Sequence, residues 1–310
     1  MKMERGSRYI HGLWREEQGS SIVLIGLMLM GLLAACALII DGGTLFAERS
    51  HLQKAANAAA LSGAQELTGQ SQTVTAIVQK ILQEHQEAGS LKSTGIELGK
   101  SIRVSLAKPV PLHFAKLLGW DEVTVEAEAA AQILPMGSGT GVAPLGIDDS
   151  IALEYGKAYK LKVDQTQSVS GVFGILALGG NGANTYEYNL MHGYSNEVDI
   201  GDIIDTQTGN IAGNTRDAVQ YRINADPYPP ADLSHRDSPR ILLVPTYKPY
   251  NFTTNQMKQI QVTGFAYFYI TDPMSSKDTA ISGIFIKRTG KGTAKPGAID
   301  KGAYAIRLIE

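Results

Sequence analysis

The chain has 310 residues, of which 44% are hydrophobic and 19% are charged, and its formal net charge is -2. The 28 basic residues are balanced by 30 acidic ones, so the chain lacks the basic excess of a nucleic-acid binder. A single cysteine excludes an internal disulfide framework and a multi-cysteine zinc site. This length suits one large or two ordinary domains, and we expect no nucleic-acid partner, no bound metal and no cofactor.

Residues 22–40 form an uncharged apolar run, IVLIGLMLMGLLAACALII. As a helix this run would be about 28 Å long, close to the roughly 30 Å of a bilayer's hydrocarbon core. A transmembrane helix is therefore predicted over residues 20–40. More basic side chains precede the run than follow it before residue 60, so the positive-inside rule predicts a cytoplasmic leader at residues 1–19 and an extracellular remainder. The basic residues before the run are Lys2, Arg5, Arg8 and Arg15, and those after it are Arg49 and Lys54.

Two processing sites are candidates in and before this run. The string Leu33-Ala34-Ala35-Cys36 fits a bacterial lipobox, in which Cys36 would be lipidated. The sequence stays apolar after Cys36, however, which favours an ordinary helix residue. Glu17-Gln18-Gly19 looks like a prepilin cleavage site, but Leu24 stands where prepilins usually carry Glu. Lipidation at Cys36 and cleavage after Gly19 both stay open at this point.

A stripe of apolar and small residues continues the helix beyond the run. Its members are separated by 7, 4, 3, 4 and 4 residues, which is the spacing of one helix face, and they are Leu45, Leu52, Ala56, Ala59, Gly63 and Leu67. Small residues let a second helix approach closely, but the stripe can equally pack on the chain's own globular part. With two small residues of the apolar run included, the candidate helix-packing residues are Gly31, Ala35, Leu52, Ala56, Ala59 and Gly63.

Residues 41–64 contain a dense motif. It consists of Asp41-Gly42-Gly43, Phe46, Arg49-Ser50, Leu52-Gln53 and Ala55-Ala56-Asn57-Ala58-Ala59-Ala60-Leu61-Ser62-Gly63-Ala64. Together with the charged leader, it resembles the N-terminal signature of TadE/TadG-like proteins of Flp (Tad-type) pilus assembly, over residues 15–66. The C-terminal half resembles, through weaker motifs, the extracellular part of TadG-related proteins from Gram-positive bacteria.

This resemblance implies a membrane-anchored component of pilus assembly, either a minor pseudopilin or a scaffold. Its partners would be the membrane and other pilus assembly or pilin proteins, with self-association as a further option. The resemblance implies no chemistry, and the sequence also lacks a Gly-x-Ser-x-Gly nucleophile elbow. We therefore do not expect an enzyme.

Residues 41–134 are predicted to form a pilin-like α/β unit. Apolar residues at 74, 77, 78, 81 and 82 follow the helical period, with Gly89 as a natural stop. Alternating patterns at 102–106 and 123–128 predict two strands, and Pro111 and Gly119 bracket a short helix between them. Residues 135–141, PMGSGTG, carry three glycines and no charge, and are predicted to be a flexible linker.

Residues 142–310 are predicted to form an extracellular, β-rich domain in which the helical period disappears. Strands are expected at 159–163, 172–178, 240–246, 260–271, 281–288 and 303–309, and their short spacing indicates a sandwich or barrel. Both faces of 260–271 are apolar, which favours a central strand; a partner-binding aromatic face is the alternative. Three carboxylates at Asp199, Asp202 and Asp205 lack the EF-hand spacing of a calcium site.

The predicted fold class is thus α+β: a long N-terminal transmembrane and amphipathic helix, a small α/β unit, and a β-rich domain. We expect a single-pass protein of the cell membrane, with its N-terminus in the cytoplasm, that assembles pili through protein contacts. The alternative function is cell-surface adhesion or wall binding by the β-rich domain, with the helix acting only as a tether.

Overall fold

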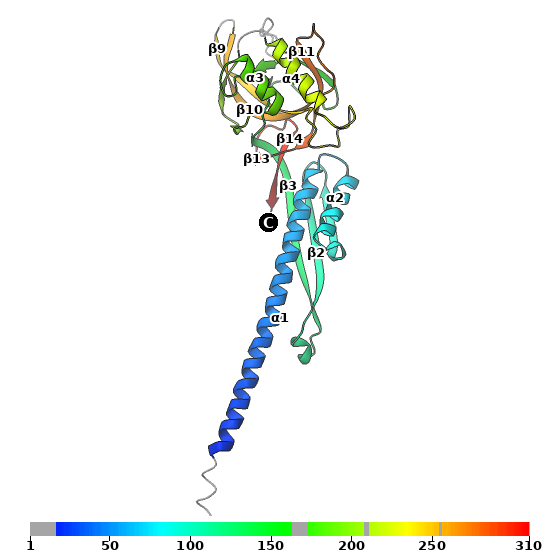
Figure 1. Ribbon diagram of the computed structural model, residues 1–310, viewed down its shortest axis with the longest axis vertical. Helices are drawn as coiled ribbons and strands as arrows, with labels where there is room; N and C mark the ends of the chain where they lie inside the picture. Colours follow the sequence, from blue (N-terminus) through cyan, green and yellow to red (C-terminus); the bar gives the residue numbers. More distant parts are fainter. Residues whose placement is uncertain (1–16, 163–172, 208–210, 254–255, 310) are drawn as a thin grey trace, which may run out of the picture.

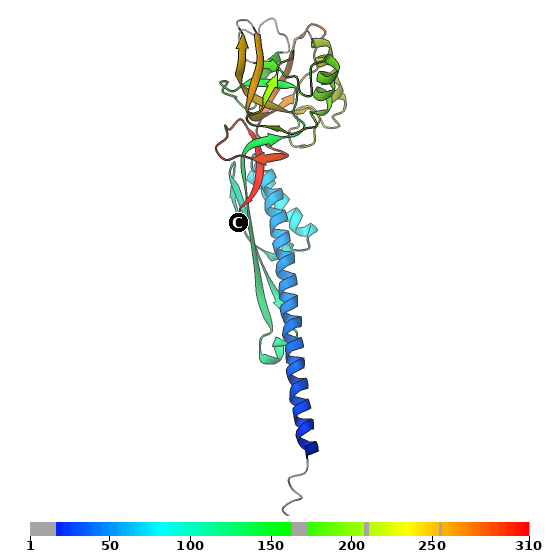
Figure 2. The same ribbon diagram turned by 90° about the vertical axis from the view of Figure 1, so that its left-hand side faces the viewer.

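The computed structural model describes residues 17–162, 173–207, 211–253 and 256–309. The molecule is elongated (Figure 1). Helix α1 (Glu17–Gln65) runs along most of its length, and a strand-rich unit lies beyond the C-terminal end of this helix. The first half of α1 projects alone from the opposite end, whereas its second half lies against a sheet and a second helix (Figure 2). The predicted fold class is confirmed.

The second half of α1 belongs to a stalk built on a sheet in the order β1-β2-β3-β14-β12. These strands are β1 (Leu91–Glu97), β2 (Ser101–Pro111), β3 (Glu122–Gly139), β14 (Ala303–Ile309) and β12 (Arg288–Thr289). The short strands β13 (Gly292–Ala294) and β7 (Val198–Asp199) also pair with β3. The stalk further contains helix α2 (Ser71–Glu84) and the 3₁₀ turns η1 (Ala88–Ser90) and η2 (Ala115–Leu118).

Most elements of the stalk form where the sequence pattern predicts them. Val74, Val78 and Leu82 are the buried face of α2, and Ile102, Val104 and Leu106 alternate inward along β2. These side chains share one core with the alanine-rich face of α1. Strand β1 was not expected, because its sequence, LKSTGIE, alternates weakly and lies at the sheet edge beside β2.

The strand-rich unit contains a second sheet in the order β5-β11-β10-β9-β4-β6, with β8 paired to β10. Its strands are β4 (Leu145–Asp148), β5 (Ala158–Lys162), β6 (Phe173–Ile175), β8 (Ile203–Asp205), β9 (Ile241–Thr253), β10 (Gln256–Ile270) and β11 (Ala280–Ile286). Strand β10 is central, as predicted. Phe265, Tyr267 and Tyr269 are buried on one of its faces, so this aromatic face is core rather than a partner-binding surface.

The sequence shows no helical period after residue 141, but the β-rich unit nevertheless contains two helices. Helices α3 (Ala183–His192) and α4 (Ala212–Asn224) contribute buried residues to the core on one face of the second sheet. Their buried faces include polar side chains, which hide the apolar period. Asn189 donates to the carbonyl of Leu178 over 2.7 Å, and Arg222 donates to the carbonyl of Pro239 over 2.5 Å. Hydrogen bonds to backbone oxygens thus satisfy side chains that composition alone would place on the surface.

The expected flexible linker at residues 135–141 is also contradicted. Residues Pro135 to Gly139 are the end of β3, where Pro135 lies opposite Tyr304 of β14 and Gly139 lies opposite both Gly292 and Val198. Strand β3 therefore passes from the stalk into the strand-rich unit, and β14 returns from that unit into the stalk sheet (Figure 1). Glycine at position 139 lets the side chain of Leu243 pack closely against β3, because a Cβ on Gly139 would lie 2.8 Å from Leu243 Cδ2. The division of the chain into domains at this point stays a prediction.

Candidate functional site along the long helix

Residues 22–40 of α1 are apolar, and all of them except the partly buried Ala37 are exposed. One helix among the described residues, Ser21–Gln65, is long and apolar enough to cross a membrane, with a mean hydropathy of 2.9 in its most apolar window. Gly31 and Ala35 are exposed, and the space beside Gly31 is open. Cys36 is exposed as well, and Gly19 lies near the beginning of the helix. Lipidation and cleavage stay predictions.

The C-terminal half of α1 packs on the chain itself. Leu52, Ala56 and Ala59 are fully buried in the stalk core. A Cβ on Gly63 would lie 2.6 Å from Ile102 Cδ1 and 3.0 Å from Val78 Cγ2, so glycine is needed for this approach. Four of the six candidate helix-packing residues therefore contact the chain's own stalk rather than a second chain. Gly31 and Ala35 are the two candidates that this packing leaves free for another helix.

A buried carboxylate fixes α1 to the hairpin of β2 and β3. Glu87 is 2% exposed and accepts hydrogen bonds from Lys108 Nζ over 2.7 Å and from Ser90 Oγ over 2.5 Å. His51 Nδ1 of α1 lies 3.0 Å from Glu87, and Lys108 also reaches Glu48 of α1 over 2.9 Å. Burial opposes the charge on Glu87, but its partners, Lys108 first, hold the pKa of this carboxyl below its ordinary value. The same bonds, to Glu87 and then Glu48, raise the pKa of Lys108.

These shifts predict how the stability of the stalk depends on pH. The pKa of Glu87 is lower in the folded chain than in the unfolded chain. Its contribution to the free energy of unfolding is therefore present above the unfolded pKa of about 4.3 and is lost as the pH falls through the folded pKa. Because the pKa of Lys108 is raised, its contribution is present below about 10.4 and is lost as the pH rises through the folded pKa. Glu87→Gln is expected to lower the free energy of unfolding by on the order of 2 kcal/mol at pH 7, because Lys108 keeps Glu48 as a partner. The variant should also lose less stability than the unaltered chain as the pH falls.

The measurement is urea unfolding of the full chain in detergent from pH 7 down to about pH 2, so that the range passes through the lowered pKa of Glu87. Glu126→Gln is the matched control, because Glu126 pairs with Lys92 where both side chains are exposed, and it is expected to change little. An acid slope that is equally steep in Glu87→Gln and the unaltered chain would contradict this assignment.

The tip of the β2–β3 hairpin is attached to α1 where the apolar run ends. Asp41 is 5% exposed, and its carboxylate accepts the backbone N–H groups of His113, Phe114 and Ala115 over 2.9, 3.0 and 2.7 Å. Burial alone would raise the pKa of Asp41, but these donors, Ala115 first, hold it below its ordinary value. In the sequence, Asp41 is only the first residue of a motif. Its bonds to a loop more than 70 residues away in the chain leave no local signal in the sequence.

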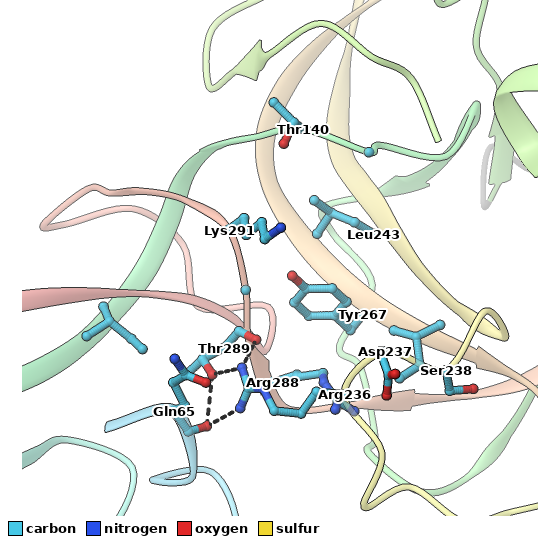
Figure 3. Close-up of a pocket in the computed structure, with 14 residues that line it drawn as sticks. Gln65, Thr140, Arg236, Asp237, Ser238, Leu243, Tyr267, Arg288, Thr289 and Lys291 are labelled. Carbon is cyan, nitrogen blue, oxygen red and sulfur yellow. Dashed lines mark hydrogen bonds between the residues drawn. The ribbon is translucent and has the colours of Figure 1, made fainter. Parts of the chain in front are cut away.

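The C-terminal end of α1 is capped by the strand-rich unit. Arg236 donates through Nη1 to the carbonyl of Gln65 over 2.5 Å, and through Nη2 to the carbonyl and hydroxyl of Thr289 over 2.7 and 2.6 Å (Figure 3). The hydroxyl of Thr289 donates to Gln65 as well, over 2.9 Å. The last turn of α1 carries no basic residue, so the cation that the negative end of the helix favours comes from another part of the chain. Sequence reasoning missed Arg236 and Thr289, since neither belongs to a motif.

A cavity of about 510 Å³ opens beside this cap (Figure 3). Arg236, Arg288 and Lys291 line it together with Tyr267 and Asp237. Burial lowers the pKa of Arg288, and the neighbouring Arg236 lowers it further; burial raises the pKa of Tyr267 to about 12. Of these cations, Arg236 is the one bound to the helix end, so it joins the stalk to the strand-rich unit.

The acidic segment is not gathered into a metal site. Asp202 accepts the backbone N–H of Asp199 over 2.9 Å, while Asp205 accepts from Gln259. In the described ranges, no group of three or more His, Cys, Asp or Glu side chains is placed to hold a metal ion.

The comparisons with known proteins concern the same helix. Residues 19–66 match the Tad family, described as Flp pilus-assembly TadE/G-like. No curated protein and no solved structure matches the chain significantly. The matched segment begins just before the apolar run, contains Asp41 and the buried stripe, and ends beside the capped C-terminus of α1. The resemblance drawn from the sequence is thereby confirmed for this stretch, and residues 19–66 are similar to the TadE/G-like segment of Flp pilus-assembly proteins.

Proposed function

We propose that this chain is a membrane-anchored component of Tad/Flp-type pilus assembly that acts through protein contacts, as a minor pseudopilin or a scaffold. The observation that carries the proposal is the division of α1. Its TadE/G-like segment combines an exposed apolar run with a half that is buried in the stalk. A helix divided in this way suits a protein that is held in a bilayer by one half and holds a folded unit outside by the other.

The orientation follows the positive-inside rule, with the leader in the cytoplasm and the stalk and strand-rich unit outside. From Asp41 to Gln65 the helix extends about 36 Å, and the stalk packs along this length. The strand-rich unit is thus presented at a fixed distance from the membrane, because β3 and β14 connect it to the stalk by two adjacent strands.

Cross-linking in intact cells, followed by pull-down of the tagged full chain and mass spectrometry, tests this function. Co-purification of the Tad ATPase, platform proteins or major pilin is expected. Recovery of wall or envelope components alone would contradict assembly and favour the alternative, an adhesion or wall-binding protein tethered by α1. The same sample reports whether the N-terminal peptide is cut after Gly19 and whether Cys36 carries lipid.

Gly31 and Ala35 supply a sharper test, since they are the candidate packing residues that the stalk leaves free. They are four residues apart, which is the small-xxx-small spacing of closely packed membrane helices. Leucine at both positions is expected to reduce the recovered membrane partners several-fold while the stalk keeps its stability. Gly26→Leu is the matched control, because Gly26 is also open and lies roughly 140° and 180° around the helix from Gly31 and Ala35. Equal recovery from the double variant and the control would contradict packing through this face.

A further inference from the structure

The hairpin tip, residues 112–121, exposes apolar side chains that nothing in the described chain covers. Leu117 is 84% exposed and Trp120 is 67% exposed. Phe114 in the tip and Phe46 on the neighbouring turn of α1 are exposed as well. Single exposed apolar residues are ordinary, but a group of this size on a small loop indicates a surface that meets an apolar medium.

The tip is an ordered turn, so this exposure is built into its backbone. Gly119 adopts the left-handed conformation, with φ of 89°, and ends the 3₁₀ turn. Trp120 N donates to the carbonyl of Ala115 over 3.2 Å, and Leu112 N donates to that of Asp121 over 3.0 Å. These bonds hold the loop closed while Leu117 and Trp120 project from it.

The position of the tip along α1 indicates which apolar medium its exposed side chains meet. Asp41 is the first residue after the apolar run, and its carboxylate binds three backbone N–H groups of the tip. If the run spans the roughly 30 Å of hydrocarbon, Asp41 and the tip bound to it lie at the boundary between hydrocarbon and headgroups. Figures 1 and 2 both show the tip beside α1, at the end of the hairpin that lies furthest from the strand-rich unit.

The composition of the tip fits this boundary. Tryptophan is enriched where membranes meet water, because its ring is apolar and its N–H still finds a polar partner. Lys116 lies 3.8 Å from Asp121, and both side chains are exposed, so the tip presents no excess of positive charge. Contact with lipid would therefore depend on apolar insertion rather than on anionic headgroups.

We propose that the hairpin tip is a second membrane contact, in which Leu117 and Trp120 enter the outer interface of the same bilayer that residues 22–40 cross. The inference rests on the membrane anchoring proposed above. A helix crossing alone can tilt and rotate, whereas two contacts on one rigid stalk restrict both motions. The tip thus sets the angle at which the strand-rich unit stands on the membrane.

Fluorescence of Trp120 tests the contact in the full chain. The two tryptophans are Trp14 and Trp120, so Trp14→Phe leaves Trp120 as the single reporter. The chain is reconstituted in phosphatidylcholine vesicles in which some lipids carry a quencher at a shallow acyl position. The control is Trp14→Phe/Trp120→Phe/Tyr250→Trp, because Tyr250 is an exposed residue of β9 in the strand-rich unit.

Quenching of Trp120 by the labelled lipid is expected to be several-fold stronger than that of the control tryptophan, and Leu117→Ser is expected to weaken it. If the chain floats with the vesicles but Trp120 is quenched only by aqueous iodide, the tip contact is wrong while the anchor stands. Shielding of Trp120 from both quenchers would also overturn it, since a second copy would then cover the tip. A chain that fails to float with the vesicles would overturn the anchor and the contact together.

Discussion

Gly63→Leu is expected to destabilise the stalk by about 3 kcal/mol or more. The first added carbon would already lie 2.6 Å from Ile102 Cδ1 and 3.0 Å from Val78 Cγ2, so leucine would have to displace buried side chains of α2 and β2. Such a loss is a large part of the roughly 5–15 kcal/mol that holds a typical domain folded. Hydrogen exchange of stalk peptides in the full chain, in detergent, measures the loss locally without assuming that the whole molecule unfolds in one step.

Gly43→Leu is the matched control for this change. Gly43 belongs to the same motif and the same helix, but the space beside it is open, so leucine should gain up to about 1 kcal/mol from helix propensity. If both variants exchange like the unaltered chain, the close contact at Gly63 is wrong. If both are destabilised equally, the effect belongs to the helix and not to its packing against Val78 and Ile102.

This prediction also changes what the motif's alanines and glycine can reveal about assembly. A substitution such as Ala56→Leu or Gly63→Leu that abolished piliation would report an unfolded stalk, because both residues are buried within the chain. Loss of a pilus partner is better tested at Gly31 and Ala35, which lie outside the stalk core. Removing the strand-rich unit is a poor test of adhesion for a related reason: the deletion would also remove β14, which pairs with β3 in the stalk sheet.

The parts of the fold that follow from local periodicity were predictable. The alternation of Ile102, Val104 and Leu106 with polar residues predicted β2, and the helical spacing of Val74, Val78 and Leu82 predicted α2. Helices α3 and α4 were hidden because their buried faces contain groups such as Asn189 and Arg222, whose partners are backbone carbonyls outside the helices, 11 and 17 residues away in the chain. Burial of a polar group depends on such partners, and one sequence does not contain them.

The composition of the glycine-rich segment at residues 135–141 also failed to reveal its contacts in the fold. Three glycines without charge are typical of a linker, yet a Cβ on Gly137 would lie 2.6 Å from Lys295 Cβ and one on Gly139 would lie 2.8 Å from Leu243. Glycine here permits contact between strands rather than freedom of the backbone. The same applies to the candidate site: Asp41 and Arg236 act at distances of about 70 and 170 residues along the chain, so no motif could connect them to the ends they hold.

Arg236→Ala is expected to loosen the joint between α1 and the strand-rich unit. It removes the charged donor from the carbonyls of Gln65 and Thr289, and Thr289 keeps only one weaker bond to the helix end. Losing hydrogen bonds from a charged group at this partly exposed helix end costs about 2 kcal/mol, which corresponds to roughly 30-fold faster hydrogen exchange in the last turn of α1. The stalk sheet should keep its protection, because the pairing of β3 with β14 does not involve Arg236.

Two controls separate the cap from a general effect of losing an arginine. Arg216 also donates to two backbone carbonyls, those of Ser275 and Ser276, but it lies within the strand-rich unit, so Arg216→Ala should leave the last turn of α1 unchanged. Arg236→Lys keeps the charge near the helix end but loses the two-pronged geometry of the guanidinium, so an intermediate rate is expected. Unchanged exchange at residues 62–67 in Arg236→Ala would mean that strand pairing alone holds the joint. A local increase would instead make Arg236 the residue that fixes the strand-rich unit to the end of the TadE/G-like helix.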